Sequence, residues 1–350
     1  MGSFRLAPEW ARQDAVILVW PHAHSDWAKT SNERQLKAID DTYIELCRYI
    51  SRNEKVLLVA YDSDHQQHIQ HALKLNNIKQ DNVVFILIPT NDTWVRDYGP
   101  IFVEQEAINP ETKLLDFAFN AWGNKYKHED DNLFNQNLIH QLCITTPSID
   151  LDIVLEGGNL EINAQGELLS SSSCFKRKHQ DLKATQEFFE KWFCSKLLWI
   201  NDVVLQGDDT DGHIDTLARF CNDDLIIYSA RGNKSDPNNN HLHSLEKQLN
   251  NINRESANQF ELIPLPLPEP LFLDDKQLPA SYANFLITNE YILVPVFNDK
   301  QDAPTLKLLD ELFPSKEIID IESRALLTQF GGIHCASMQI PECISYEDSY

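Results

Sequence analysis

The sequence predicts a mixed α/β fold in which strands and helices alternate along the whole chain. Short apolar runs typical of strands are interspersed with segments whose apolar residues recur at helical spacing. No glycine- or serine-rich linker, charge block or low-complexity tract divides the 350 residues. We therefore expect an α/β protein with residues 1–350 in a single domain.

The strand and helix assignments follow from these two periodicities, taken from the N-terminus onward. The expected strands are Ala15–Trp20, Lys55–Ala60, Val83–Ile88, Pro100–Val103, Lys113–Phe117, Asp152–Leu155, Leu197–Ile200, Asp224–Ser229, Gln259–Pro264 and Tyr291–Val296. The expected helices, each with one polar and one apolar face, are Asn32–Arg52, Asp64–Asn76, Gln180–Phe193, Leu242–Ile252 and Asp302–Leu312.

A loose internal recurrence suggests repeated units. The order strand, helix, strand occurs over residues 15–60 and again over residues 291–321. Asp97, Glu156 and His213 follow one another at intervals of about 60 residues, and Cys335 lies about two intervals later. A ring of such units would bring one loop from each toward a shared axis, where a pocket forms.

Composition limits the partners and the compartment. The chain has 53 acidic and 30 basic residues, for a formal net charge of −23, so nucleic acids and anionic membranes would be repelled. A cationic ligand fits this charge, although solubility alone also explains it. The seven cysteines are scattered without a CxxC pair, and no apolar stretch is long enough for a signal peptide or a membrane span. We expect a cytoplasmic protein with reduced thiols.

Two segments place carboxylates beside aromatic residues or glycines. In NDTWVRDYGP, from Asn91, Trp94 and Asp97 follow an apolar strand. An aromatic face with a carboxylate can hold a planar cation, whereas the alternative is an ordinary polar turn in which Arg96 pairs with an acid. In the second segment Glu156 precedes a pair of glycines and a hairpin with its turn at Ala164–Gly166, and a turn-forming role for this carboxylate is equally open.

Two later segments carry a histidine and a thiol. In GDDTDGHIDTLARF, His213 and Asp215 flank Ile214 at the start of an expected strand, so they would share the face opposite Ile214. Such a pair is typical of an acid/base unit or of half a metal site. In FGGIHCASMQIP, Cys335 follows a glycine bend that would expose it to a ligand, although most lone cysteines are merely buried.

Taken in order, these segments resemble the agmatine deiminase family, which includes the bacterial-type peptidylarginine deiminases and belongs to the guanidino-group-modifying (pentein) superfamily. The resemblance spans nearly the whole chain. It also includes the strings APEW, WPHAHSDW, FNAWGNKY, LPASYANF and IHC. The chain departs from the family in having FGG in place of a triple glycine and ASMQ after the cysteine.

The resemblance implies a single five-bladed α/β propeller with pseudo-fivefold symmetry, and a set of roles. The implied roles are Cys335 as nucleophile, His213 as acid/base, Glu156 as the group that orients it, and Asp97 and Asp215 as the guanidinium clamp. Trp94 and Trp122 would offer aromatic surfaces to the cationic substrate. Neither a metal nor an organic cofactor is required.

The implied reaction is the hydrolysis of agmatine to N-carbamoylputrescine and ammonia in putrescine biosynthesis. A guanidinium carbon is a poor electrophile until carboxylates fix its plane for attack by sulfur. Cys335 would then form a covalent thiouronium, with His213 donating a proton to ammonia and later activating water. A cationic substrate or a protonated His213 would lower the pKa of the thiol.

Other readings remain open on the sequence alone. A peptidylarginine deiminase would need an open cleft, and an enzyme for free arginine would need a basic residue for the carboxylate. A metallohydrolase would use His22, His24 and His213 with acidic ligands, and a non-enzymatic protein would only bind the cation through Asp97, Asp215 and Trp94. The oligomeric state is also open, with a homodimer as one option.

Overall fold

The computed structural model describes residues 4–30, 33–105, 107–177, 180–230, 237–255 and 259–347. Its strands are β1 (Phe4–Leu6), β2 (Gln13–Val19), β3 (Lys55–Ala60), β4 (Val83–Leu87), β5 (Ile101–Gln105), β6 (Thr112–Ala118), β7 (Ser148–Val154), β8 (Glu161–Ile162), β9 (Glu167–Ser171), β10 (Lys196–Ile200), β11 (Ala218–Asn222), β12 (Leu225–Ala230), β13 (Glu261–Pro266), β14 (Phe272–Leu273), β15 (Lys276–Gln277), β16 (Leu286–Ile287), β17 (Tyr291–Val296), β18 (Glu317–Glu322) and β19 (Ser337–Pro341).

The helices fall between these strands. They are α1 (Asp26–Thr30), α2 (Glu33–Ile50), α3 (Ser63–Leu75), α4 (Val95–Tyr98), α5 (Ala121–Asn124), α6 (Phe134–Gln141), α7 (Ser172–Arg177), α8 (Leu182–Trp192), α9 (Asn239–Glu255), α10 (Asp302–Leu312) and α11 (Arg324–Leu327). Three 3₁₀ turns complete the set, η1 (Asp131–Leu133), η2 (Gly157–Asn159) and η3 (Ile214–Thr216). The predicted α/β class is confirmed.

One strand pattern recurs along the chain, in which an antiparallel pair is followed by a parallel pair. The antiparallel pairs β5–β6, β8–β9, β11–β12 and β16–β17 are each extended by a parallel neighbour, which is β7, β10, β13 or β18 respectively. A parallel pair needs a crossover, and helices supply it. The recurrence predicted from residues 15–60 and 291–321 is therefore present as β2–α2–β3 and β17–α10–β18.

The two ends of the chain complete the remaining unit. The C-terminal strand β19 lies antiparallel to β2, and β2 continues in parallel to β3 and β4. The sheet thus has the order β19-β2-β3-β4 and repeats the pattern of the others with strands from both ends of the chain. The short strand β1 pairs with β5, which belongs to the next unit along the chain.

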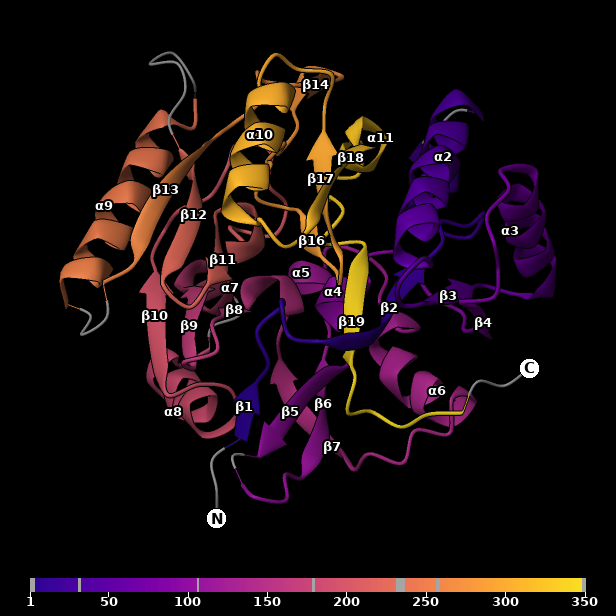
Figure 1. The fold of residues 1–350 in the computed structure, drawn as a ribbon, viewed down its shortest axis with the longest axis horizontal. Coiled ribbons are helices and arrows are strands. Elements are labelled where there is room, and N and C mark those ends of the chain that lie inside the picture. Colours follow the sequence, from indigo (N-terminus) through magenta and orange to yellow (C-terminus); the bar gives the residue numbers. More distant parts are fainter. Residues whose placement is uncertain are drawn as a thin grey trace.

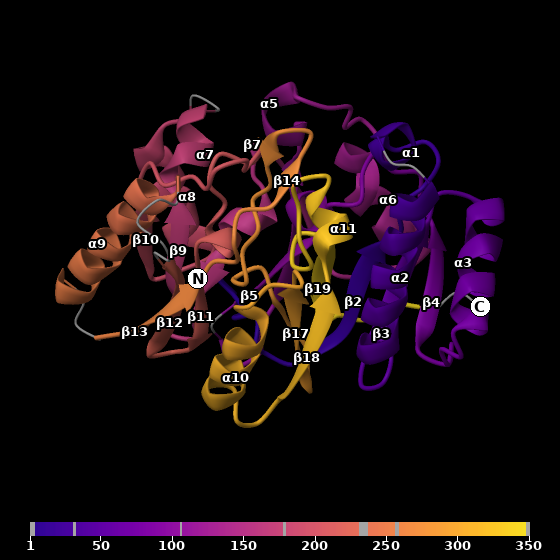
Figure 2. The ribbon, with the colours of Figure 1, turned by 90° about the horizontal axis from the view of Figure 1, so that it is seen from above.

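The long helices lie on the outside of the molecule, and the short helix α4 lies near its centre (Figure 1). Turned by 90°, the structure shows α1 and α5 on one side, together with the β14 hairpin (Figure 2). The apolar core forms clusters between the sheets and these helices; the largest includes all of the apolar residues of β2 and β3. The strand ends and short turns near the centre are thereby held by rigid elements.

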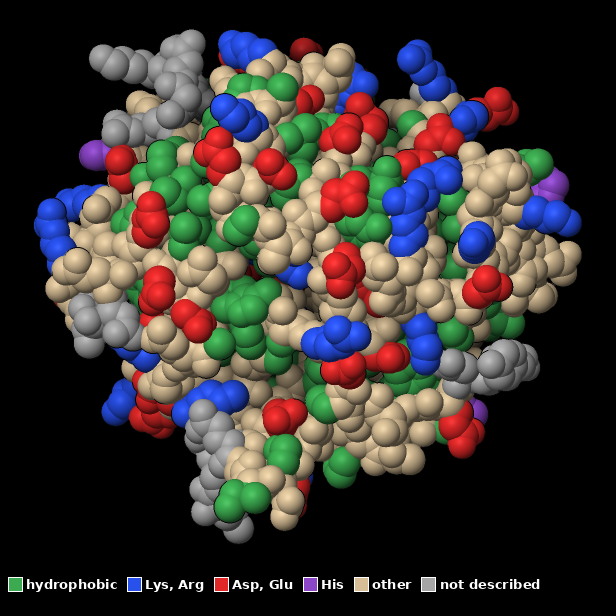
Figure 3. All heavy atoms as spheres, viewed as in Figure 1, with side chains coloured by type: hydrophobic (Ala, Val, Ile, Leu, Met, Phe, Trp, Pro, Cys, Tyr) green, Lys and Arg blue, Asp and Glu red, His purple; other side chains and the backbone are tan. Residues whose placement is uncertain are grey.

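Every predicted strand and helix overlaps an observed one, although Asn32 lies outside the described residues. The prediction omitted β1, β14, β15, β16 and β19, which are short or carry polar residues. The hairpin expected around Ala164–Gly166 is present as β8 and β9, and the strand expected from Ile214 is present only from Ala218, as β11. On the face seen in Figure 3, acidic side chains are scattered among basic ones, without one continuous basic surface. None of the helices within the described ranges is both long and apolar enough to cross a membrane.

Candidate active site

The predicted site residues come from loops and short turns that the sheets bring together. Asp97 lies on α4, Glu156 directly precedes η2, His213 and Asp215 lie around η3, and Cys335 lies just before β19. A cavity of about 150 Å³ opens onto two of them, Asp97 and Cys335, and we call it the catalytic cavity; Glu156, His213 and Asp215 are not among its lining residues. It is lined by Asp26, Asp92, Trp94, Asp97, Trp122, Tyr126, Asp209, Thr210, Thr328, Gln329, Phe330, Gly331 and Cys335.

The expectation that His213 and Asp215 sit on a strand is wrong. Residues Ile214–Thr216 form a 3₁₀ turn, and the strand begins only at Ala218. His213, Ile214 and Asp215 are all fully buried, so no alternation between an inner and an outer face separates them. The tight turn, rather than strand periodicity, directs both the imidazole and the carboxylate inward.

Asp97 is held by two N–H donors. Its Oδ1 accepts a bond of 2.9 Å from the backbone N–H of Gly158, and its Oδ2 accepts one of 3.0 Å from Trp122 Nε1. A Cβ at position 158 would lie 2.7 Å from His213 Nδ1, 2.8 Å from Asp97 Oδ1 and 3.1 Å from an oxygen of Asp215. Glycine is required there because any side chain would fill the space between the catalytic groups.

His213 and Glu156 form a buried acid/base pair. His213 Nε2 lies 3.1 Å from Glu156 Oε2, and both side chains are inaccessible to solvent. Burial acts to lower the pKa of His213, but Asp97 and Glu156 outweigh it and raise the pKa to about 9. The second ring nitrogen, Nδ1, has no hydrogen-bond partner and lies 3.6 Å from Asp97 Oδ1. The imidazole is thus protonated at neutral pH, with one nitrogen left for a ligand.

Asp215 is tied on one side and open on the other. Its Oδ2 lies 2.8 Å from His334 Nδ1 and 3.6 Å from the sulfur of Cys335. Its Oδ1 is buried and has no hydrogen-bond partner. An unpaired buried carboxylate oxygen is unfavourable unless a donor occupies the site, so Oδ1 marks where a ligand with N–H groups would bind.

Cys335 lies at the base of the catalytic cavity beside Asn284. The side-chain amide nitrogen of Asn284 lies 3.3 Å from the sulfur, and its Oδ1 accepts a bond of 3.1 Å from the N–H of His334. Burial and then the carboxylates of Asp215 and Asp97 raise the pKa of the thiol well above its ordinary value. The expectation that a protonated His213 would by itself lower the pKa of this thiol is therefore wrong. The unliganded protein holds a neutral thiol.

We expect alkylation of Cys335 by iodoacetamide to be slow at neutral pH, because the reacting species is the thiolate. The alkylation rate should still be increasing above pH 9. The rate is measured by mass spectrometry on the peptide containing Cys335, with the exposed Cys143 as an internal reference. A rate that reaches its plateau at or below neutral pH would mean that the thiolate is already formed without a ligand.

Aromatic side chains close the walls of the catalytic cavity. A Cβ on Gly331 would come within 2.2 Å of the ring of Trp94, so the glycine bend lets the chain lie flat against this indole. Trp94 also packs on Trp27, and Trp122 packs edge-on against Phe119 and Tyr126. Both predicted aromatic residues therefore lie at the cavity, each less than a tenth exposed.

The fold brings to the site several residues whose roles the motifs alone do not indicate. Asn284 and Glu9 lie within the strings LPASYANF and APEW, and His334 within IHC, so the strings contained them without indicating their contacts. Arg96 points away from the catalytic cavity, donating to Gln339 and to the carbonyl of His334. A structural role for Arg96, as expected, fits these bonds.

The structure separates the histidines that a metallohydrolase would need. His22 bonds to Thr90 and packs on Tyr61, and neither it nor His24 is among the lining residues of the catalytic cavity. Among the described residues, one group of potential ligands has its donor atoms within 4.8 Å of one another, namely Glu156, Cys174 and His213. Two of these three already bond to each other, and all are buried.

A buried thiol, a protonated histidine and two carboxylates in one cluster beside a cavity are the groups that a cysteine hydrolase for a planar cation requires. The model of the Porphyromonas-type peptidyl-arginine deiminase family matches residues 5–341, and the chain belongs to this family.

Individual relatives are similar over nearly their full lengths. An agmatine deiminase of Pseudomonas putida is 28% identical over 97% of this chain and 95% of its own. A structure described as a cysteine-to-serine variant of a C. jejuni agmatine deiminase with substrate bound is 32% identical, with a TM-score of 0.86 and 96% of each chain covered. A putative arginine deiminase from Porphyromonas gingivalis is 34% identical, with a TM-score of 0.86 over 97% of this chain and 99% of its own.

Proposed function

We propose that this chain is an agmatine deiminase, which hydrolyses agmatine to N-carbamoylputrescine and ammonia. The observation that carries the proposal is the lining of the catalytic cavity. Asp26, Asp92, Asp97 and Asp209 line it, and no lysine or arginine occurs among its described lining residues. The relatives described as agmatine deiminases support the same assignment.

The charges of the cavity favour agmatine over free arginine. Agmatine has a guanidinium at one end and an ammonium at the other, whereas arginine also has a carboxylate that needs a cationic partner. Asp26 and Asp92 line the cavity together with Asp97, so the cavity has carboxylates for the ammonium as well as for the guanidinium. Asp209 is already engaged by Lys125 and Tyr126.

The open atoms of the site suggest how the guanidinium binds. Asp215 Oδ1 has no partner, and Asp97 lies across Gly158 from it, so the two carboxylates could accept N–H bonds from opposite edges of one planar cation. The positive charge of the substrate would offset the two carboxylates that raise the pKa of Cys335. The thiolate would then form only when substrate is bound.

The reaction proceeds in two halves. As substrate binds, the thiol of Cys335 loses its proton to solvent, and the thiolate sulfur forms a bond to the guanidinium carbon. His213 donates its proton to the departing nitrogen, so the carbon–nitrogen bond breaks and ammonia leaves. His213, now neutral, takes a proton from water as the water oxygen bonds to the carbon of the S-alkylthiouronium. The carbon–sulfur bond breaks, giving the ureido product and restoring the thiol. Glu156, which is hydrogen-bonded to His213, stabilises the imidazole whenever it is protonated.

A peptidylarginine deiminase is the second candidate, favoured by the name of the family. The enclosed walls argue against it, because Trp94 and Trp122 are only 4% and 6% exposed and leave little room for a peptide backbone.

The test is ammonia release and ureido-product formation from agmatine, free arginine and an arginine-containing peptide, each incubated with the purified protein. Turnover of agmatine alone is expected. Turnover of the peptide would assign the second candidate instead, and saturable binding without product would leave a cation-binding protein.

We infer further that the sheets with three or four strands are the blades of a five-bladed propeller. The repeated order of an antiparallel and a parallel pair supports this, as does the completion of one sheet by β19. A crystal structure in which successive sheets are related by rotation about one axis would test it. We also propose that the chain folds as one domain, which a single cooperative unfolding transition would support.

A further inference from the structure

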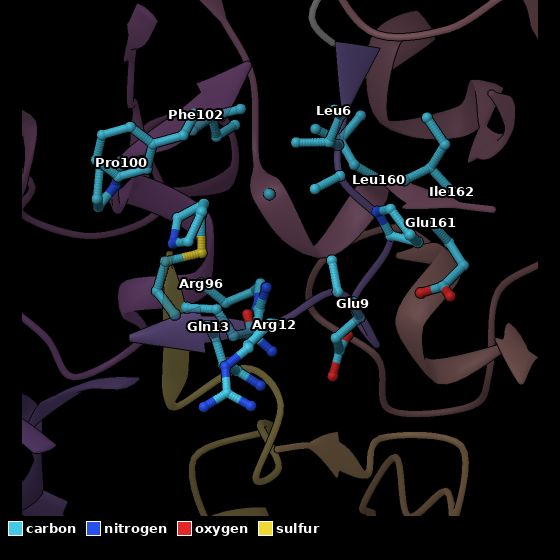
Figure 4. Close-up of a pocket in the computed structure, with 18 residues that line it drawn as sticks. Leu6, Glu9, Arg12, Gln13, Arg96, Pro100, Phe102, Leu160, Glu161 and Ile162 are labelled. Carbon is cyan, nitrogen blue, oxygen red and sulfur yellow. The ribbon is translucent and has the colours of Figure 1, made fainter. Parts of the chain in front are cut away.

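A second cavity, which we call the N-terminal cavity, lies beside the catalytic one. It has a volume of about 100 Å³, and Glu9, Arg12 and Gln13 of the N-terminal segment contribute to its lining. The neighbouring residues Arg96 and Asp97 on α4 line different cavities, the N-terminal and the catalytic one respectively. Figure 4 shows Glu9 and Glu161 on one side of the N-terminal cavity, with Arg12 and Arg96 on the other.

Glu9 is bound from three directions at the border of this cavity. Its Oε2 lies 2.5 Å from Arg219 Nη2 and 2.8 Å from His334 Nε2, and its Oε1 accepts a bond of 2.8 Å from the N–H of Ile287. His334 is 325 residues away in the sequence and directly precedes the catalytic cysteine. Through the carboxylate of Glu9, the N-terminal segment therefore contacts the residue next to the catalytic cysteine.

His334 lies between two carboxylates. Its Nε2 is 2.8 Å from Glu9 and its Nδ1 is 2.8 Å from Asp215. Burial acts to raise the pKa of Glu9 and of Asp215, but nearby cations outweigh it, and both pKa values lie below the ordinary range. Both carboxylates are thus ionised and can only accept hydrogen bonds, so both ring nitrogens of His334 must carry protons.

The far end of this arrangement is a fixed cation. Arg219 is fully buried, donates from Nε to Glu161 at 2.7 Å, and donates from Nη1 to the carbonyl oxygens of Ala283 and Phe285. The buried groups therefore alternate in charge from Glu161 through Arg219, Glu9 and His334 to Asp215. The last of them has an unpaired Oδ1 and lies next to Cys335, which lines the catalytic cavity.

We propose that Glu9 is a positioning residue for the guanidinium site, acting through His334 to hold Asp215 ionised and with Oδ1 turned toward the substrate. The inference rests on the proposed function, because it assigns Asp215 to a guanidinium. Asp215 cannot rotate without breaking its 2.8 Å bond to His334, and the carboxylate of Glu9 holds the other ring nitrogen of His334 at 2.8 Å.

The test is the affinity for agmatine in a Cys335→Ser background, measured by calorimetry across the acid range with and without Glu9→Gln. We expect Glu9→Gln to weaken binding on the order of 10- to 100-fold, the range found for side chains that orient metal ligands. The acid limb of the binding profile should move to higher pH, since Asp215 loses a cationic partner and is protonated more easily. The charged groups that face Glu9 and set this profile are Arg219, His334, Arg96 and Glu161.

Two further variants separate positioning from simple destabilisation. Arg12→Gln removes an exposed ion pair with Glu342 from the same segment and should leave affinity and pH profile unchanged. Glu9→Asp keeps the charge and should bring the acid limb back toward that of the parent protein. An unchanged acid limb in Glu9→Gln would overturn the inference, even if its affinity fell.

A measurement on the unmodified protein keeps the test valid if Glu9→Gln does not fold. Neutron crystallography should show deuterium on both ring nitrogens of His334, and deuterium on one nitrogen only would contradict the proposal. The proposed function fails separately. If the unmodified protein turns over no guanidinium compound, the function is wrong; if it turns over agmatine and Glu9→Gln retains the parent profile, only the role of Glu9 is wrong.

Discussion

Cys335→Ser is expected to lower kcat for agmatine by at least about 10⁴-fold while the protein stays folded, because a serine hydroxyl does not ionise at the pH where the thiolate forms. The hydroxyl is nearly the size of the thiol, so Asn284 and Asp215 keep their neighbours. Agmatine should still bind, since the groups proposed to hold the cation are intact. Ammonia release and calorimetric binding measure the two effects on one preparation.

The matched control for this variant is Cys143→Ser. Cys143 is an exposed cysteine outside the catalytic cavity, and the same chemical change there should leave kcat unchanged. Substantial turnover by Cys335→Ser would remove the sulfur from the mechanism and would favour an attack by activated water. Loss of turnover in both variants would point instead to a general sensitivity to substitution.

Asp97→Asn is expected to lower kcat/KM by about 10²- to 10⁴-fold. The variant loses two hydrogen bonds to the charged carboxylate of Asp97, which together contribute about 3–6 kcal/mol. An amide has one acceptor oxygen, whereas Asp97 accepts from both Gly158 and Trp122. One of these N–H groups would therefore face the amide –NH₂. Of the groups that raise the pKa of His213, Asp97 is the strongest, so the basic limb of the kcat profile should also move to lower pH.

The control for the second variant is another buried carboxylate. Asp116 on β6 bonds to Asn135 and does not line the catalytic cavity, so Asp116→Asn should leave kcat/KM and its pH profile unchanged. If Asp97→Asn kept its kcat/KM, the guanidinium would have to be held by Asp215 and other groups. If kcat/KM fell while the basic limb stayed in place, Asp97 would act in binding the substrate and not through the pKa of His213.

The fold could be predicted from local pattern wherever strands are long and apolar. Runs such as Lys55–Ala60 and Tyr291–Val296 match observed strands because burial on both faces requires continuous apolar residues. Short strands such as β14 and β16 were not predicted, since two residues give no periodicity. Their pairing depends on neighbours that are remote or polar in sequence, so only the folded chain reveals them.

The site was predicted residue by residue, but part of the reasoning was wrong. His213 and Asp215 were expected on a strand face opposite Ile214, whereas all three are buried and a 3₁₀ turn directs them. Asp97, Glu156, Trp94 and Trp122 all lie at the site, and the sequence order of the motifs indicated as much. Their roles in catalysis stay predictions until the variants are measured.

The sequence by itself determined the α/β class, the chemical groups available and the loops that carry them, because these depend on local periodicity and on residue type. Only the tertiary structure decided which groups are coupled. Glu9 meets His334 across 325 residues, and the pKa of Cys335 is raised rather than lowered in the unliganded protein. Burial and the distance between charges set these properties, and neither is encoded in the spacing of residues along the chain.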